Sequence, residues 1–321
     1  MISARLAIIW EALTTPVPHV RVSGIIATER SANMENDDLT RRDFVTMTVA
    51  AGMAAATSAN LTAQQVVETN VDIKTADGTC DAAFIHPASG SHPGVVIWPD
   101  AFGLRPSMRE IARRLAGDGY SVLVPNPFYR VAKAPVFEDA STFNFGDPPQ
   151  RAKLTPLMGS INAAGAAERD AAAFIAWLDA QRQVDRTKKI GTQGYCMGGA
   201  LVVRTAASVP NRVGAGASFH GGGLVTANPD SPHLLAPKIK GRMYFGIAAN
   251  DDMQQPDAKT KLKESFDRAK VPAEIEVYSQ AQHGWCVSDM PKQANGQPIY
   301  SKSDADRAWG KLLALYKAAL A

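Results

Sequence analysis

The sequence predicts one α/β domain whose central sheet is mostly parallel and carries helices on both faces. Short runs that are apolar throughout, such as 94–98, alternate with segments of helical spacing, such as 107–116. Strands that are apolar on every residue are typical of sheets covered on both sides. No internal repeat and no linker divides the chain, and its 321 residues suffice for a large core.

The composition is that of an ordinary soluble globular protein. The chain has 34 basic and 31 acidic residues and a formal net charge of only +3. No basic cluster is interleaved with aromatic residues, so we expect no nucleic-acid partner. The three cysteines are too few for a disulfide framework and lack metal-ligand spacing, so no metal site is predicted. Of these, Cys80 and Cys286 are expected to be inert.

Residues 1–60 are predicted to be a targeting region, disordered or removed, ahead of a domain over 61–321. The pair Arg41-Arg42 belongs to a twin-arginine pattern and is followed by an Ala/Gly-rich run over 45–56. This pattern predicts export to the periplasm or beyond. The run is too short for a stable membrane span after processing. An amphipathic helix or a retained anchor are the alternatives, and Met34 is an alternative start.

The first elements predicted are an antiparallel hairpin and one βαβ unit. Asp77-Gly78 is a hairpin turn signal between two alternating runs. Apolar residues at helical spacing precede Gly117, which favours a helix stop. The expected bounds are strands over 66–75, 79–86, 94–98 and 120–124 and a helix over 107–116.

The rest of the chain starts with an irregular segment and then returns to alternation. Residues 128–165 are rich in Pro, Gly and aromatics, which predicts a long functional or mobile loop. Ser303 is the expected N-cap of the last helix. The expected bounds are helices over 166–181, 200–207, 257–269 and 303–320, and strands leading into Gly194 and over 213–219, 242–248 and 274–278.

The segment Gly194-Tyr195-Cys196-Met197-Gly198 has the pattern of a nucleophile elbow, with cysteine where serine is commoner. The nucleophile in such a turn is strained, and the glycines let the strand and the helix approach. The turn places the sulfur at a helix N-terminus, where the macrodipole favours a thiolate. A glycine-rich turn with a buried cysteine is the alternative interpretation.

Five polar residues, Asp100, Cys196, His220, Asp251 and His283, each follow a predicted strand. Ligands bind at the carboxyl ends of strands in such sheets. The order nucleophile, acid, histidine is that of α/β-hydrolases. We therefore predict that Cys196 attacks, that His283 carries protons and that Asp251 orients the imidazole.

Alternatives remain for each of these assignments. Asp251 is alternatively a helix cap, and Asp252 is an alternative acid. His283 is alternatively a surface loop histidine. His220 is interpreted as a pocket wall or a hydrogen-bonding side chain rather than as a second base.

An oxyanion intermediate needs two backbone donors. The N–H of Met197 follows the nucleophile, and the N–H of Ala101 lies in the turn after the first buried strand. Phe102 and Trp285 adjoin the predicted site in the sequence and are expected, together with His220, to contact the substrate.

With these motifs, residues 66–320 resemble the dienelactone hydrolase family, the carboxymethylenebutenolidases. The resemblance rests on Gly194-Tyr195-Cys196-Met197-Gly198-Gly199, Ala249-Asn250-Asp251 and His283-Gly284-Trp285. It implies a monomeric α/β-hydrolase fold, a Cys-Asp-His triad and no metal or organic cofactor. It also implies hydrolysis of cyclic enol-lactones bearing a carboxylate, in the breakdown of (chloro)aromatic compounds.

The resemblance extends to substrate contacts, with differences. Asp100 stands where the family has a glutamate that contacts the resting thiol, and its side chain is one methylene shorter. Arg130 matches a family arginine that holds the substrate carboxylate, a task that suits a guanidinium. A second family arginine is replaced by Val287. This loss indicates a less anionic or larger ester or lactone.

The sequence thus predicts a secreted cysteine-dependent hydrolase that forms an acyl-thioester with a small-molecule ester or lactone. The expected assembly is a monomer or a small homo-oligomer. A broad carboxylesterase or peptidase on the same fold is one alternative. A non-catalytic binding or redox protein is the other, because a lone reactive thiol is easily oxidised in an oxidising compartment.

Overall fold

The computed structural model describes residues 65–293 and 295–320, which belong to one compact unit. The predicted targeting region, its Arg41-Arg42 pair and Met34 lie outside these residues, so the boundary near residue 60 stays a prediction. Within the described ranges, no helix combines the length and the apolar character that crossing a membrane requires.

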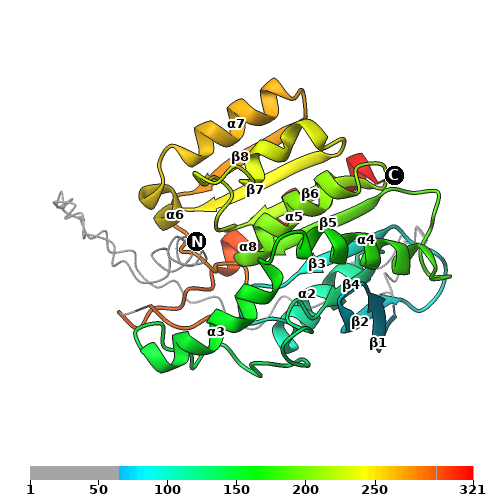
Figure 1. Cartoon of the computed structure of the whole chain (residues 1–321), viewed down its shortest axis with the longest axis horizontal. Helices are drawn as coiled ribbons and strands as arrows, with labels where there is room; N and C mark the ends of the chain where they lie inside the picture. The colour runs from blue at the N-terminus through cyan, green and yellow to red at the C-terminus, as the bar shows by residue number, and fades with distance from the viewer. Residues whose placement is uncertain (1–64, 294, 321) are drawn as a thin grey trace, which may run out of the picture. The chain divides into compact units, whose positions relative to one another are not determined.

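The centre of the unit is an eight-stranded sheet in the order β1-β2-β4-β3-β5-β6-β7-β8 (Figure 1). β2 pairs antiparallel with β1 and β4, and all other neighbours are parallel. The predicted mostly parallel sheet is therefore confirmed. The strands are β1 Val66–Thr75, β2 Gly78–Pro87, β3 Gly94–Trp98, β4 Ser121–Pro125, β5 Ile190–Tyr195, β6 Val213–Phe219, β7 Arg242–Ala248 and β8 Ala273–Tyr278.

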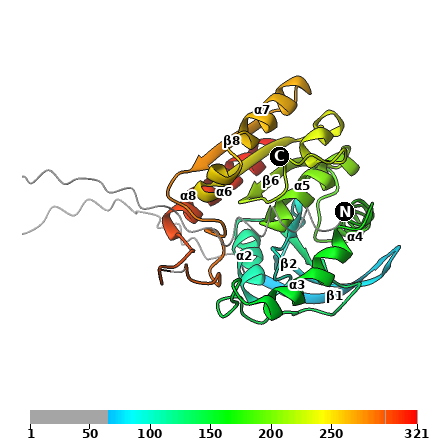
Figure 2. The same cartoon turned by 60° about the vertical axis from the view of Figure 1, so that its left-hand side comes forward.

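The composition of each strand follows its place in the sheet. Every residue of β3 and β4 is buried, which matches their continuous apolar runs. β1 is an edge strand, and of its residues only Ile73 is buried. Its hairpin with β2 closes at Thr75 opposite Gly78, and it lies at the edge opposite to β8 and α7 (Figure 2).

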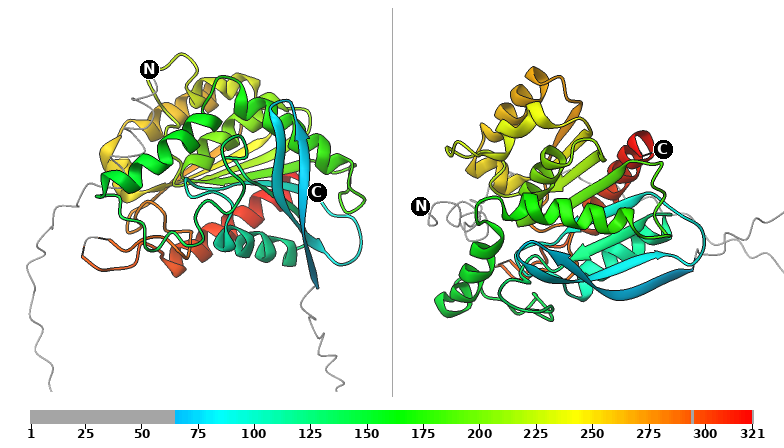
Figure 3. Two further views of the ribbon diagram at one scale, coloured as in Figure 1. Left: turned by 60° about the horizontal axis from the view of Figure 1, so that its bottom comes forward. Right: turned by 45° about the vertical axis from the view of Figure 1, so that its right-hand side comes forward.

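Helices cover both faces of the sheet (Figure 3). On one face, α2 packs on β2 and β4, and α8 packs on β6 and β7. On the other face, α5 packs on β5 and β6, flanked by α4 and α7. The helices are α2 Pro106–Gly117, α3 Pro148–Ile161, α4 Ala166–Asp179, α5 Met197–Ser208, α6 Ala249–Gln254, α7 Ala258–Arg268 and α8 Lys302–Ala319, with a 3₁₀ helix η1 at Pro232–Lys238.

Two local predictions were wrong. The segment 128–165 is not a continuous loop, because it contains α3, which buries Leu154, Leu157, Met158 and Ile161 along one side. The N-cap of α8 is Ser301 rather than Ser303, and its Oγ accepts a hydrogen bond from the N–H of Asp304 at 3.4 Å. The backbone of Ser301 is extended, as an N-cap requires, whereas Ser303 already lies inside the helix.

Candidate active site

The five predicted polar residues meet at one edge of the sheet. Asp100 follows β3, Cys196 follows β5, His220 follows β6, Asp251 follows β7 and His283 follows β8. These strands are consecutive neighbours in the parallel part of the sheet. Their carboxyl ends therefore lie side by side, as expected for a ligand site in this architecture.

Cys196 occupies a sharp turn between β5 and α5. Its backbone has φ 52° and ψ −114°, a strained conformation for a residue with a side chain. A Cβ atom on Gly194 would lie 2.2 Å from the carbonyl oxygen of Gly198, and one on Gly198 would lie 2.3 Å from that of Trp98. The two glycines thus permit the close approach that raises the cysteine at the strand end.

His283 is paired with Asp251. Its Nδ1 lies 2.9 Å and 2.8 Å from the two carboxylate oxygens, and the residue is only 1% exposed. The alternative acid, Asp252, instead binds the Lys259 ammonium at 2.6 Å. The N–H of His283 donates to Asn250 Oδ1 at 2.8 Å, so Asn250 also orients the histidine backbone, a contact that the sequence analysis did not predict.

The charge on His283 depends on its two neighbours. Burial alone would lower the pKa of the imidazole, but the Asp251 carboxylate and the Cys196 sulfur outweigh it and raise the pKa well above its usual value. The sulfur raises the pKa both through its charge and through its contact with the ring, although His283 Nε2 is buried and makes no hydrogen bond of ordinary geometry within the described residues. Loose contacts of this kind are common in active sites without substrate.

Two backbone donors are available beside Cys196. The N–H of Met197 is at the first position of α5, where a helix offers no acceptor. The N–H of Ala101 makes no hydrogen bond to any described residue. Because Gly198 packs against the carbonyl of Trp98, the elbow and the turn that carries Ala101 are neighbours. The arrangement is suitable for an oxyanion hole.

Asp100 is held in a buried ion network. The Arg105 guanidinium donates to both Asp100 oxygens, at 2.7 and 2.9 Å, and to both Asp289 oxygens, at 2.8 and 2.7 Å. The N–H of Phe102 also donates to Asp100, at 2.9 Å. The geometry therefore argues against the thiol contact that the resemblance implied for Asp100. Arg105 itself was missed, although an arginine within a buried turn is a signal of a buried ion pair.

Arg130 is similarly engaged. Its guanidinium binds Asp77 at 2.6 Å and both oxygens of Asp170, at 2.9 and 2.7 Å. It also lies over the Tyr129 ring, 4.5 Å from the centroid. The geometry argues against the predicted anion clamp, because two carboxylates of the chain already occupy the planar fork.

The two aromatic residues expected to contact the substrate pack into the protein. Phe102 makes edge contacts with Phe137 and Phe143 of the segment 128–165. Trp285 is fully buried and stacks on Tyr278, 4.7 Å between ring centroids. Neither side chain lines the two cavities described next.

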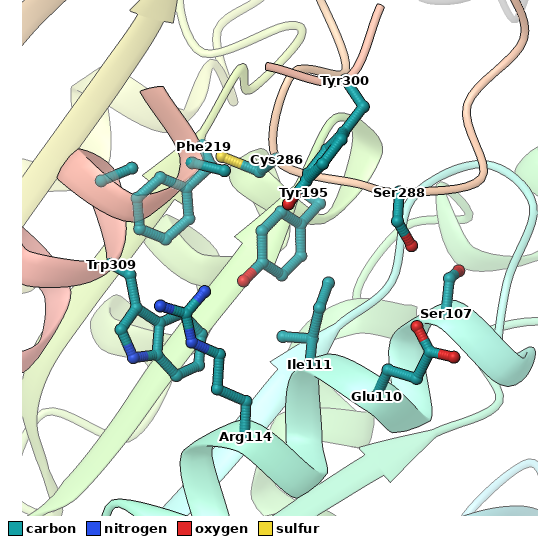
Figure 4. A pocket seen from close by; sticks show the side chains of 12 residues that line it. Ser107, Glu110, Ile111, Arg114, Tyr195, Phe219, Cys286, Ser288, Tyr300 and Trp309 are labelled. Atoms are coloured by element: carbon teal, nitrogen blue, oxygen red, sulfur yellow. The ribbon is translucent and has the colours of Figure 1, made fainter. Parts of the chain in front are cut away.

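A cavity of about 220 Å³ is lined in part by Asp251. The loop 221–224 forms one wall, and Ile247, Ala258 and Leu262 contribute apolar side chains. A cavity of about 160 Å³ lies between α2 and α8 and is lined by Tyr195 and Cys286 (Figure 4). It contains none of the predicted catalytic side chains. The first cavity is therefore the better candidate for part of a substrate site.

The remaining cysteines have no partner in a disulfide. All three cysteines are free, and burial raises the pKa of both Cys80 and Cys286. A raised pKa keeps a thiol protonated, and the protonated form is the poorer nucleophile. No group of three or more His, Cys, Asp or Glu side chains in the described part of the chain could hold a metal ion.

Known proteins resemble this chain over most of its length. A carboxymethylenebutenolidase from Rhodococcus opacus is 28% identical over 215 residues, 65% of this chain and 77% of that protein. The structure of a dienelactone hydrolase-like promiscuous phosphotriesterase from metagenomic libraries matches with a TM-score of 0.64 and 25% identity, covering 80% of this chain and 99% of that one. A dienelactone hydrolase from Anabaena variabilis shares the fold, with a TM-score of 0.55, 15% identity and coverage of 80% and 100%.

A family model described as the dienelactone hydrolase family matches residues 80–320. The match begins in β2 and ends just beyond α8, so it includes every strand that carries a predicted site residue. With this match over most of its length, the chain belongs to the dienelactone hydrolase family.

Proposed function

We propose that this protein hydrolyses an uncharged ester or lactone through Cys196, His283 and Asp251, by way of an acyl-thioester. Membership of the dienelactone hydrolase family supports an ester or lactone hydrolase. The observation that carries the finer proposal is the buried His283–Asp251 pair, whose imidazole is influenced by the sulfur of a strained elbow.

In the first step, His283 Nε2 takes the thiol proton of Cys196, and the sulfur electron pair attacks the substrate carbonyl carbon to form the new C–S bond. The carbonyl oxygen becomes an oxyanion, which the N–H groups of Ala101 and Met197 stabilise. Collapse of this intermediate breaks the C–O bond, and the His283 imidazolium gives its Nε2 proton to the leaving alkoxide. The acyl group is then bound to the sulfur as a thioester.

In the second step, water replaces the alcohol. His283 takes a proton from the water, whose oxygen attacks the thioester carbonyl. The second oxyanion collapses with departure of the thiolate and release of the acid. Acylation removes the negative charge from the sulfur, which is one of the causes that raise the pKa of His283. The pKa therefore falls in the acyl-enzyme, when the imidazole must act as a base.

The charges around the site favour a substrate without a carboxylate. Arg130 and Arg105 are each bound by two carboxylates of the chain. Val287 is fully buried where the resemblance implies a second arginine. A substrate carboxylate would therefore have to compete with existing ion pairs. The cavity of about 220 Å³ beside Asp251 has apolar walls that suit an uncharged arm of an ester.

The test is a substrate panel with purified protein. It compares p-nitrophenyl acetate and a neutral lactone with lactones that carry a carboxylate, and it includes a phosphotriester because a related structure has that activity. We expect neutral esters or lactones to have the highest kcat/KM and Cys196→Ala to abolish turnover while the protein stays folded. Equal turnover by wild type and Cys196→Ala would contradict the role of the thiol. A preference for the anionic lactones would contradict the proposed substrate class.

A further inference from the structure

His220 is held in a conformation that few side chains adopt. It is the first residue after β6, and its φ of 41° is in the left-handed region. Its N–H donates to the Gly246 carbonyl at 2.7 Å, which fixes this backbone. Glycine or asparagine would satisfy the backbone with less strain. We therefore expect the imidazole to make an interaction that offsets the strain of the backbone.

The imidazole contacts the backbone of the cysteine. The N–H of Cys196 donates to His220 Nδ1 at 3.1 Å and also lies 3.1 Å from the Phe219 carbonyl oxygen. The N–H of Gly222 in turn donates to the Cys196 carbonyl at 3.1 Å. Residues 219–222 thus hold both backbone polar groups of the strained elbow residue.

This contact determines the proton on the ring. Because Nδ1 accepts a hydrogen bond, the neutral ring carries its proton on Nε2. Burial, and then the nearby charge of His283, lower the pKa of His220 well below its usual value. Ring centroids of His220 and His283 are 5.0 Å apart. A proton on Nδ1 would break the bond to Cys196 and place a second cation beside His283.

We propose that His220 is a positioning residue for the nucleophile. Its uncharged ring keeps the N–H of Cys196 engaged, so the elbow stays in the conformation that presents the sulfur to His283 and to the oxyanion donors. His220 is not a second base, because Nδ1, which carries the lone pair of the neutral ring, already accepts the hydrogen bond from the N–H of Cys196. This inference rests on the proposed role of Cys196 as the nucleophile.

Two replacements of similar size distinguish the effect of the hydrogen-bond acceptor at His220 Nδ1 from the effect of the shape of the side chain. In His220→Asn, Oδ1 can occupy the place of Nδ1, and asparagine tolerates a positive φ. His220→Leu has a similar shape and no acceptor. Thermal unfolding and circular dichroism establish that each variant is folded. If His220→Leu does not fold, His220→Ala serves as the variant without an acceptor.

The first readout is independent of any substrate. The rate of Cys196 alkylation by iodoacetamide is measured by peptide mapping, which distinguishes it from Cys80 and Cys286. We expect His220→Asn to react at a rate close to that of the wild type. Loss of one hydrogen bond to the elbow predicts a rate about tenfold lower in His220→Leu.

The second readout is turnover of p-nitrophenyl acetate. We expect kcat to fall about tenfold in His220→Leu, with KM nearly unchanged, and to remain near the wild-type value in His220→Asn. The acidic limb of the pH profile should coincide for wild type and His220→Asn, because His220 does not titrate there.

Three outcomes would overturn the inference: wild-type alkylation in His220→Leu, equally slow alkylation in both variants, or an acidic limb that moves in His220→Asn. If the alkylation pattern is as expected but no ester is cleaved, the proposed function fails and the positioning role stands.

Discussion

Replacing Asp251 with asparagine tests the electrostatic basis of the site. The carboxylate is the first cause that raises the pKa of His283, and it accepts from Nδ1 at 2.8 and 2.9 Å. Asparagine removes the charge, and its amide N–H₂ can donate to Nδ1. That contact favours the tautomer with the proton on Nε2. In this tautomer Nε2 has no lone pair with which to accept a proton from water. We therefore expect Asp251→Asn to lose catalysis while keeping its fold.

The size of the expected loss in kcat follows from two changes, the wrong tautomer of His283 and the missing negative charge of Asp251. Loss of the correct tautomer in a comparable hydrolase site lowers kcat by about 10⁴, so a loss between about 10³ and 10⁴ is expected here. The residual kcat of Asp251→Asn should show its pH dependence at lower pH than the wild type, because the pKa of His283 falls when the negative charge of Asp251 is removed.

Stability changes with a defined sign. The folded-state pKa of His283 is raised, so its pair with Asp251 stabilises the protein fully below the unfolded-state pKa near 6.5. This contribution is lost as pH rises through the higher folded-state value. Removing one partner of a buried pair costs about 3 kcal/mol or more. Asp251→Asn should therefore lower the melting temperature most below the unfolded-state pKa and progressively less above it.

The assay combines pre-steady-state release of p-nitrophenol with thermal unfolding across pH, using Asp252→Asn as the matched control. Asp252 binds Lys259 instead of the histidine, so its variant should remain active. Wild-type turnover in Asp251→Asn, or an equal loss in both variants, would refute the assignment of the acid. A stability difference that grew with rising pH would refute the sign of the pKa shift.

The remaining predictions concern the ion pairs, the cavity and the signal. Arg105→Leu leaves Asp100 and Asp289 without their shared cation, so it should lower the free energy of unfolding by about 3–5 kcal/mol in chemical denaturation; an unchanged value would contradict the ion network. Arg130→Ala should change KM for neutral and anionic esters alike, since its partners are Asp77 and Asp170; a selective loss with anionic esters would restore the anion clamp. Ala258→Leu narrows the cavity beside Asp251 and should raise KM for bulky esters but not for acetate, and an equal effect on both would exclude the cavity as a substrate site. Replacing Arg41-Arg42 with two lysines should abolish twin-arginine export, measured by cell fractionation, and continued export would contradict the signal.

Sequence patterns predicted the parts of this protein that depend on local chemistry. Continuous apolar runs located the buried strands, and the glycines around Cys196 located the turn because only they permit its backbone contacts. The contact between Asp251 and His283 could be predicted because parallel strands end at one edge, so residues that follow such strands meet.

Contacts between distant residues were beyond these patterns. Arg105 and Asp289 are 184 residues apart, and nothing local in the sequence indicates their pairing. The same holds for Arg130. Its partners are Asp77 in the first hairpin and Asp170 in α4, whereas the sequence analysis expected it to bind the substrate. Helix α3 was missed because Pro148, Pro149 and Pro156 resemble loop residues, although the first two occupy the first turn, where proline is tolerated.

The most direct measurement is rapid quenching of the protein during turnover of p-nitrophenyl acetate, followed by mass spectrometry of the peptide that contains Cys196. An acetyl group on that sulfur, formed in the burst phase and absent from Cys196→Ala, is the predicted result. An unmodified Cys196 during rapid turnover, or an acyl group on a different side chain, would contradict the account.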